Sequence, residues 1–286
     1  MFDLILATLF ASAIGVVFKL SEKRVKERAT LLLGNYIVAV AISTVMWVKS
    51  GAQPDLSSTS LAIALVAGAI FAGDFFLMAL AIKKRGVALP VILMRLSAIV
   101  PIGASIAFFS ESPSALQFSG LVAALCAAVI LSVNVKGGEM TDAPKGNSAL
   151  LVISSLGFLL CFGVADLCLK LFDEFGKTGE KPLFFMVLFS VALMVFAVEI
   201  IVRRIRPRVK DLLWGFALGV PNMLAAYFVV SALAKLQAFV VFPIVSASTV
   251  MLISLIAAVF FKEKMTRWGV FGVALTIAAI VAINLN

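Results

Sequence analysis

The sequence predicts an all-α polytopic membrane protein with about ten transmembrane helices, arranged as two inverted five-helix repeats. The chain is 63% hydrophobic and only 14% charged, which is far too apolar for a soluble domain of this length. Many of its apolar runs approach the roughly 20 residues that a helix needs to cross a ~30 Å hydrocarbon core. Features of the first half also recur in the second half.

The apolar segments follow one another with short polar loops between them. Met1-Phe2-Asp3 lacks the basic residues of a signal peptide, so we expect the first segment to be a retained helix. Pro101 and Pro221 lie inside predicted helices and should bend or interrupt them. The segments span residues 3–20, 29–48, 60–82, 87–109, 114–134, 148–171, 183–202, 211–234, 239–261 and 267–285.

The repeat is clearest where each half closes. In both halves a glutamate is followed, nine residues later, by a glycine within an apolar helix: Glu111 and Gly120 in the first, Glu263 and Gly272 in the second. The most hydrophilic linker, 135–147, separates a first repeat, 1–134, from a second, 148–286. Because five is odd, the second repeat enters the membrane from the opposite side. Inverted repeats of this kind are typical of transporters that work by alternating access.

Composition excludes several function classes. The chain has no histidine, and its three cysteines lie in apolar segments without zinc-ligand spacing. We expect no metal, no cofactor and no enzyme activity, since no nucleophile–base arrangement or phosphate-binding loop is visible. The net charge of +9 comes from basic residues in short loops, where they serve topology and lipid headgroups, so we expect no nucleic-acid partner.

Loop charge predicts an orientation. Most Lys and Arg residues lie in the loops after the odd-numbered helices, and the positive-inside rule then places both termini outside the cytoplasm. Small-residue stripes at Ala64-x3-Gly68-x3-Ala72 and Gly215-x3-Gly219 predict close packing of helices.

The closing segments of the halves, Phe109-Ser110-Glu111 through Gly120 and Phe261-Lys262-Glu263 through Gly272, resemble EamA-type members of the drug/metabolite transporter superfamily. The resemblance covers essentially the whole chain. It implies a multi-pass protein of a bacterial inner membrane with a central transport cavity, and it leaves the substrate open. The chain departs from the family at Ser110-Glu111-Ser112, where a basic residue commonly follows the glutamate. Family members also often have cytoplasmic termini, which differs from the charge-based orientation.

Charged residues at membrane depth are costly, roughly 2.5–3.5 kcal/mol each, and therefore mark candidate sites. Asp74 and Arg95 are expected at similar depth in adjacent helices, either as a structural ion pair or as the lining of a polar cavity. Arg95 would bind a carboxylate or phosphate, and Asp74 an amine. Polar residues complete the predicted substrate site: Tyr227, Asn222, Ser97 and Ser246.

A second group is predicted to act in gating or coupling. Lys19 and Lys170 each lie near the far end of the first helix of a half, where they either reach to the interface or form electropositive gates. Asp166 precedes Lys170 by four residues, so the two can pair on one helix face. If transport is proton-coupled, Asp74 and Asp166 are the candidate proton carriers.

The sequence thus predicts a membrane transporter of a small polar or zwitterionic metabolite, such as an amino acid or organic acid. Its partners would be that substrate, the lipid bilayer and a proton as a candidate coupling ion. The alternatives are a drug or cation exporter, a lipid-carrier flippase and a non-transporting membrane scaffold. The cation-exporter alternative is weakened because the first helix has no acidic residue beyond Asp3.

Overall fold

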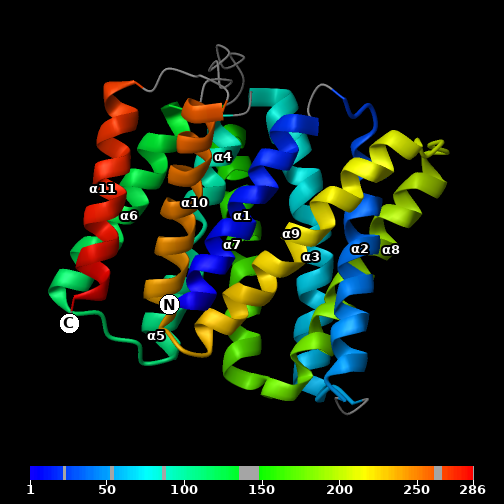
Figure 1. The fold of residues 1–286 in the computed structure, drawn as a ribbon, viewed down its shortest axis with the longest axis horizontal. Coiled ribbons are helices and arrows are strands. Elements are labelled where there is room, and N and C mark those ends of the chain that lie inside the picture. The colour runs from blue at the N-terminus through cyan, green and yellow to red at the C-terminus, as the bar shows by residue number, and fades with distance from the viewer. Residues whose placement is uncertain (22–23, 52–54, 86–87, 135–147, 261–265, 286) are drawn as a thin grey trace. The chain divides into compact units, whose positions relative to one another are not determined.

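Figure 1 shows the computed structural model of the chain, which is all-helical in the part it describes. The structure describes residues 1–286 except 22–23, 52–54, 86–87, 135–147, 261–265 and 286. The elements in chain order are α1 (Phe2–Ser21), α2 (Arg28–Lys49), α3 (Ser58–Arg85), α4 (Ala88–Leu96), α5 (Ile99–Phe108), α6 (Ala115–Asn134), α7 (Ser148–Phe175), η1 (Thr178–Glu180), α8 (Lys181–Val202), α9 (Val209–Leu233), α10 (Ala238–Phe260) and α11 (Arg267–Asn284).

The helices follow the apolar segments. Each predicted segment corresponds to one helix, except the fourth, which is divided between α4 and α5. Within the described residues, seven helices are long and apolar enough to cross a membrane. Helices are expected in a membrane because lipid offers the backbone no hydrogen-bond partner, and a helix pairs its backbone donors and acceptors internally. The chain is therefore an integral, multi-pass membrane protein, as predicted.

The helices form two compact units, and each unit draws on both halves of the sequence. Unit 1 comprises Met1–Gly73 and Cys168–Ala234, and unit 2 comprises Asp74–Leu167 and Lys235–Asn286. The sequence division into 1–134 and 148–286 describes the repeat and stays a prediction. Its linker, 135–147, lies outside the described residues.

Unit 1 contains two helix pairs related by the repeat. α9 packs along α2 in the same direction, because Gly215 approaches the backbone at Gly34 and Gly219 approaches Asn35 and Val38. α3 packs against α8 through Gly68, which approaches the Leu188 carbonyl oxygen and the Val191 side chain. The predicted close packing at both small-residue stripes is confirmed. Fully buried aromatic side chains, including Tyr36 and Phe189, fill the core of this unit.

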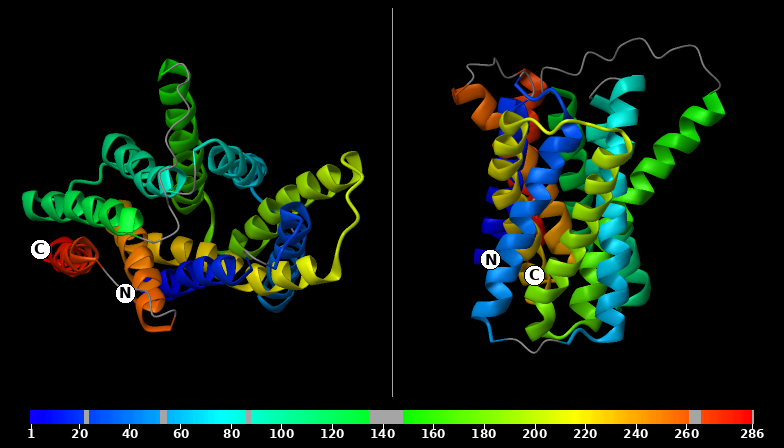
Figure 2. Two further views of the ribbon diagram at one scale, coloured as in Figure 1. Left: turned by 90° about the horizontal axis from the view of Figure 1, so that it is seen from above. Right: turned by 90° about the vertical axis from the view of Figure 1, so that its right-hand side faces the viewer.

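In unit 2, α6 and α11 pack side by side and antiparallel (Figure 1 and Figure 2). A Cβ on Gly120 of α6 would lie 2.9 Å from the Ile283 side chain of α11, and one on Gly272 of α11 would lie 2.8 Å from the Leu131 side chain of α6. The residue shift that aligns Gly120 with Gly272 also aligns Leu131 with Ile283. The two contacts are therefore reciprocal, as an inverted repeat requires.

Candidate functional site

An interrupted helix lies at Arg95 in unit 2. Ser97 and Ala98 separate α4 from α5, four and three residues before Pro101. Proline has no N–H to donate to the carbonyl four residues earlier, and its ring crowds that carbonyl. The Ser97 carbonyl instead accepts the N–H of Val100 at 2.9 Å, in a tighter turn. The prediction that Pro101 bends or interrupts its helix is confirmed.

Two other helices of unit 2 approach this interruption. The Ser246 hydroxyl of α10 donates to the Arg95 carbonyl at 3.4 Å. On α7, a Cβ at Gly163 would lie 2.8 Å from the Ser97 carbonyl oxygen, so only glycine fits there without a shift. The Ser97 hydroxyl donates to the Met94 carbonyl at 2.7 Å, within its own turn. Three predicted site residues, Arg95, Ser97 and Ser246, are thus neighbours.

Three charged side chains gather in the same unit. Asp166 lies on α7, one turn beyond Gly163, and interacts electrostatically with both Arg95 and Asp74. Asp74 is only 4% exposed. The sequence assigned Asp166 to gating or coupling and did not connect it with Arg95. Only the packing of α7 on the α4–α5 interruption brings Asp166 within electrostatic range of the Arg95 guanidinium.

The cluster has two carboxyl groups against one guanidinium, and part of its hydrogen-bonding capacity is unused. Within the described structure, Asp74 Oδ1 and Arg95 Nε are buried without a hydrogen-bond partner. Buried polar atoms are normally satisfied, and exceptions are concentrated at sites with a role besides packing. An interrupted helix beside such groups can offer a polar ligand both charge and free hydrogen-bonding positions.

The remaining predicted substrate residues, Asn222 and Tyr227, belong to α9 in unit 1. Asn222 follows Pro221, and its Nδ2 is buried without a hydrogen-bond partner in the described structure. The ring of Tyr227 lies under Lys181, whose Nζ is 4.9 Å from the ring centroid. The same Nζ donates to the Ser231 hydroxyl at 3.0 Å. Lys181 precedes the predicted segment 183–202, and nothing in its sequence spacing indicates a neighbour on α9.

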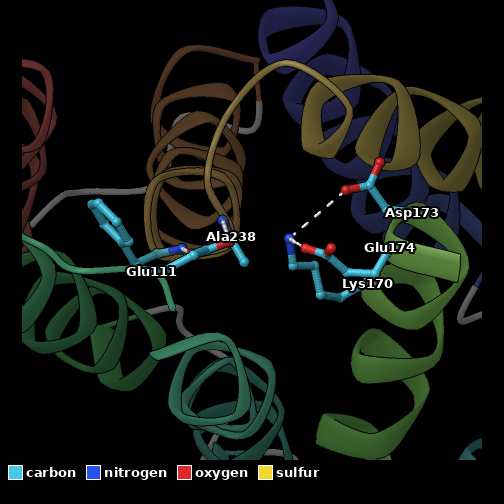
Figure 3. A network of polar contacts seen from close by, with 6 residues as sticks. Glu111, Lys170, Asp173, Glu174 and Ala238 are labelled. Carbon is cyan, nitrogen blue, oxygen red and sulfur yellow. Dashed lines mark hydrogen bonds and ion pairs between the residues drawn. The ribbon is translucent and has the colours of Figure 1, made fainter. Parts of the chain in front are cut away.

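Lys170, also in unit 1, is 3% exposed. Its ammonium pairs with Glu174 at 2.5 Å and Asp173 at 3.7 Å, as Figure 3 shows. Sequence spacing suggested Asp166, four residues before Lys170, as a partner. The two carboxylates that pair with Lys170 instead follow it on α7, three and four residues further along. Lys19 is half-buried near the end of α1. The gating roles of both lysines stay predictions.

Three acidic residues cap helix N-termini, a role that spacing did not indicate. Glu111 is buried and accepts the Ala238 N–H at 3.0 Å at the start of α10 (Figure 3). Asp211 accepts the N–H groups of Lys26 and Glu27 at 3.4 and 3.2 Å, just before α2. Each carboxylate satisfies donors that a helix start leaves unpaired.

Glu180 caps α3 in the same manner. Its carboxylate accepts the Ser57 N–H at 3.1 Å and the Ser60 hydroxyl at 2.6 Å. Burial acts to raise the pKa of Glu180, but the hydrogen bonds from Ser60 and Ser57 outweigh it and hold this pKa below its ordinary value.

Comparison with known proteins supports the fold. No family model matches the chain. A Haemophilus influenzae protein described as uncharacterized is 25% identical over 296 residues, covering 98% of this chain and 96% of that protein. A solved crystal structure superposes with a TM-score of 0.76 at 15% identity, covering 98% of both chains. This chain is thus a multi-pass membrane protein homologous to the Haemophilus protein, with a fold already seen in a solved structure.

Proposed function

We propose that this chain is an EamA-type transporter that carries a small, amine-bearing polar metabolite across a bacterial inner membrane by alternating access. The observation that carries the proposal is the charged cluster of Asp74, Arg95 and Asp166 beside the interrupted α4–α5 helix. Charges inside apolar helices are costly and usually mark substrate or ion pathways. The reciprocal contacts of α6 and α11 support the inverted repeat on which alternating access depends.

The cluster favours a substrate with a positive group. Asp166 and Arg95 offset one another, which leaves Asp74 with a buried oxygen that a ligand ammonium can approach. A substrate carboxylate can then bind Arg95 through Nε and complete the recognition of a zwitterion. We further propose that a proton is the coupling ion, with Asp74 or Asp166 as its carrier.

The test is a thermal-shift screen of the purified protein against amino acids, organic acids, sugars, nucleosides and cationic drugs. Hits are repeated on Arg95→Ala, with Arg267→Ala as a control for the loss of one exposed arginine. An amino acid that stabilises the wild type and the control, but not Arg95→Ala, supports the proposal. Counterflow of the labelled compound in proteoliposomes then establishes transport. The absence of any counterflow would favour a scaffold or flippase.

The excess of carboxyl groups in the cluster also supports a second candidate, a drug or cation exporter. Such a protein would be stabilised by apolar cations rather than amino acids. Asp74→Asn should then abolish the shift, while Arg95→Ala should leave it intact. That pattern would replace the zwitterion proposal and make Arg95 a structural partner of Asp166.

A further inference from the structure

One end of unit 1 is strongly basic. The loop between α1 and α2 and the loop between α8 and α9 both lie at this end, because α2 and α9 begin side by side and run in the same direction. Their exposed basic residues, here called the basic end, are Arg24, Lys26, Arg28, Arg203, Arg204, Arg206, Arg208 and Lys210. The sequence places these residues in two separate loops, and only the packing of α2 against α9 brings the loops to one end.

A buried carboxylate joins the two loops into one surface. Asp211, at the start of α9, is 0% exposed and accepts the backbone N–H groups of Lys26 and Glu27. Three residues further along α9, the Trp214 ring lies 5.4 Å from the guanidinium carbon of Arg24. Because the Asp211 carboxylate is buried and hydrogen-bonded to the other loop, it holds the two basic loops together. It adds no negative charge to their exposed face.

Among the residues that the structure describes at this end, the acidic side chains offset little of the charge. Glu199 is mostly buried and pairs with Arg203 at 2.6 Å. Glu27 is half-buried. The opposite end of unit 1 differs, since its described exposed charges are of both signs in equal number: Lys49, Asp55, Glu174 and Lys177. The difference in charge between the two ends of unit 1 therefore reflects where the basic residues lie on its surface. It does not simply follow from the net positive charge of the whole chain.

Exposed aliphatic side chains adjoin the basic end. Ile201 and Val202 at the end of α8 and Val209 at the start of α9 are each 73% exposed. A surface with cationic groups next to exposed aliphatic groups is complementary to a phospholipid. The cationic groups match the anionic headgroup, and the aliphatic groups match the acyl chains beside it. A soluble anion would match only the charges.

We infer that the basic end is a binding surface for anionic phospholipid headgroups, such as phosphatidylglycerol, in the leaflet that it faces. Arginines of both loops contact the phosphates, and Asp211 positions the loops so that they act together. This inference does not depend on the proposed transport function. It predicts retention of anionic lipid by the protein whatever its substrate.

The test measures lipid retained by purified protein, using native mass spectrometry after titration with phosphatidylglycerol or phosphatidylcholine. Wild type should retain the anionic lipid preferentially. Arg206→Gln/Arg208→Gln should reduce that retention by about tenfold or more. The matched control, Lys49→Gln/Lys177→Gln, removes the same charge from the opposite end and should retain it normally. Equal loss in both double variants, or none in the first, would overturn the inference.

Asp211→Asn tests the arrangement of the charges. It leaves every basic residue in place, so binding by total charge alone predicts unchanged or tighter retention. Loop positioning predicts weaker retention. If this variant fails to fold, judged by thermal unfolding in neutral detergent, the two exposed double variants still decide the outcome. Displacement of the lipid by millimolar inorganic phosphate would show a free-anion site instead and would also overturn the inference.

Discussion

Gly68 and Gly219 occupy equivalent positions in two different helices. Gly219 of α9 faces the Asn35 carbonyl oxygen and the Val38 side chain of α2, and Gly68 of α3 faces the same two groups of Leu188 and Val191 in α8. One residue shift relates Asn35 to Leu188 and Val38 to Val191. The repeat is thus preserved at the level of individual backbone contacts. Glycine at these positions lets the helices approach closely, which matters in lipid because no hydrophobic effect drives helices together there.

Alanine should not be tolerated at either position. A Cβ on Gly219 would lie 2.5 Å from the Asn35 oxygen, and one on Gly68 would press on the Leu188 oxygen. We expect each Gly→Ala variant to lower the free energy of unfolding by about 1–3 kcal/mol through overpacking. Gly73→Ala is the control, since nothing lies within 4 Å of its Cβ. Thermal unfolding in detergent measures all three, and equal melting temperatures would contradict the packing argument.

Glu111 should stabilise the start of α10. Glu111→Ala leaves the N–H groups of Ala238 and Phe239 buried and unpaired, at a cost of about 1–3 kcal/mol. Glu111→Gln keeps one acceptor oxygen and should lose less. The order wild type, Gln, Ala in melting temperature checks the cap. If Gln and Ala are equally destabilising, the negative charge rather than the acceptor is what α10 requires.

Glu180 should make the protein less stable in acid. Its pKa is lower in the folded state than in the unfolded state. The carboxylate therefore contributes stability above its unfolded pKa, and this contribution is lost as pH falls through the lower folded pKa. We expect the melting temperature to decline below about pH 4. Glu180→Gln should be less stable at neutral pH and should show a shallower decline in acid, and an unchanged slope would assign the acid sensitivity to other groups.

Asp166 and Arg95 should be energetically coupled. Asp166→Asn leaves the guanidinium without its balancing charge, and we expect a loss of about 1–3 kcal/mol. The double variant Asp166→Asn/Arg95→Gln should be less destabilised than the sum of the single variants, because neither Asp166 nor Arg95 is left charged without the other. Additive effects in this double-mutant cycle would show that the two side chains act independently.

Much of this architecture could be predicted from local sequence. Apolar length indicated the helices, because in lipid a backbone must satisfy its own hydrogen bonds. Pro101 indicated that its helix bends or is interrupted, since the missing N–H acts on its own helix, and the structure places the interruption at Ser97 and Ala98. The recurrence of Glu-x8-Gly indicated the inverted repeat. The cost of charge in lipid indicated that Asp74 and Arg95 are exceptional residues.

Contacts between helices far apart in the chain required the folded structure. The proximity of Asp166 to Arg95 depends on Gly163 allowing α7 to reach Ser97. Asp211 acts on Lys26 only because α9 and α2 begin side by side. Periodicity shows which face of a helix is apolar or polar but not which helix that face meets. Helix formation is governed by local hydrogen bonding and hydrophobicity, whereas the charged cluster and the carboxylate caps are set by the packing of separate helices.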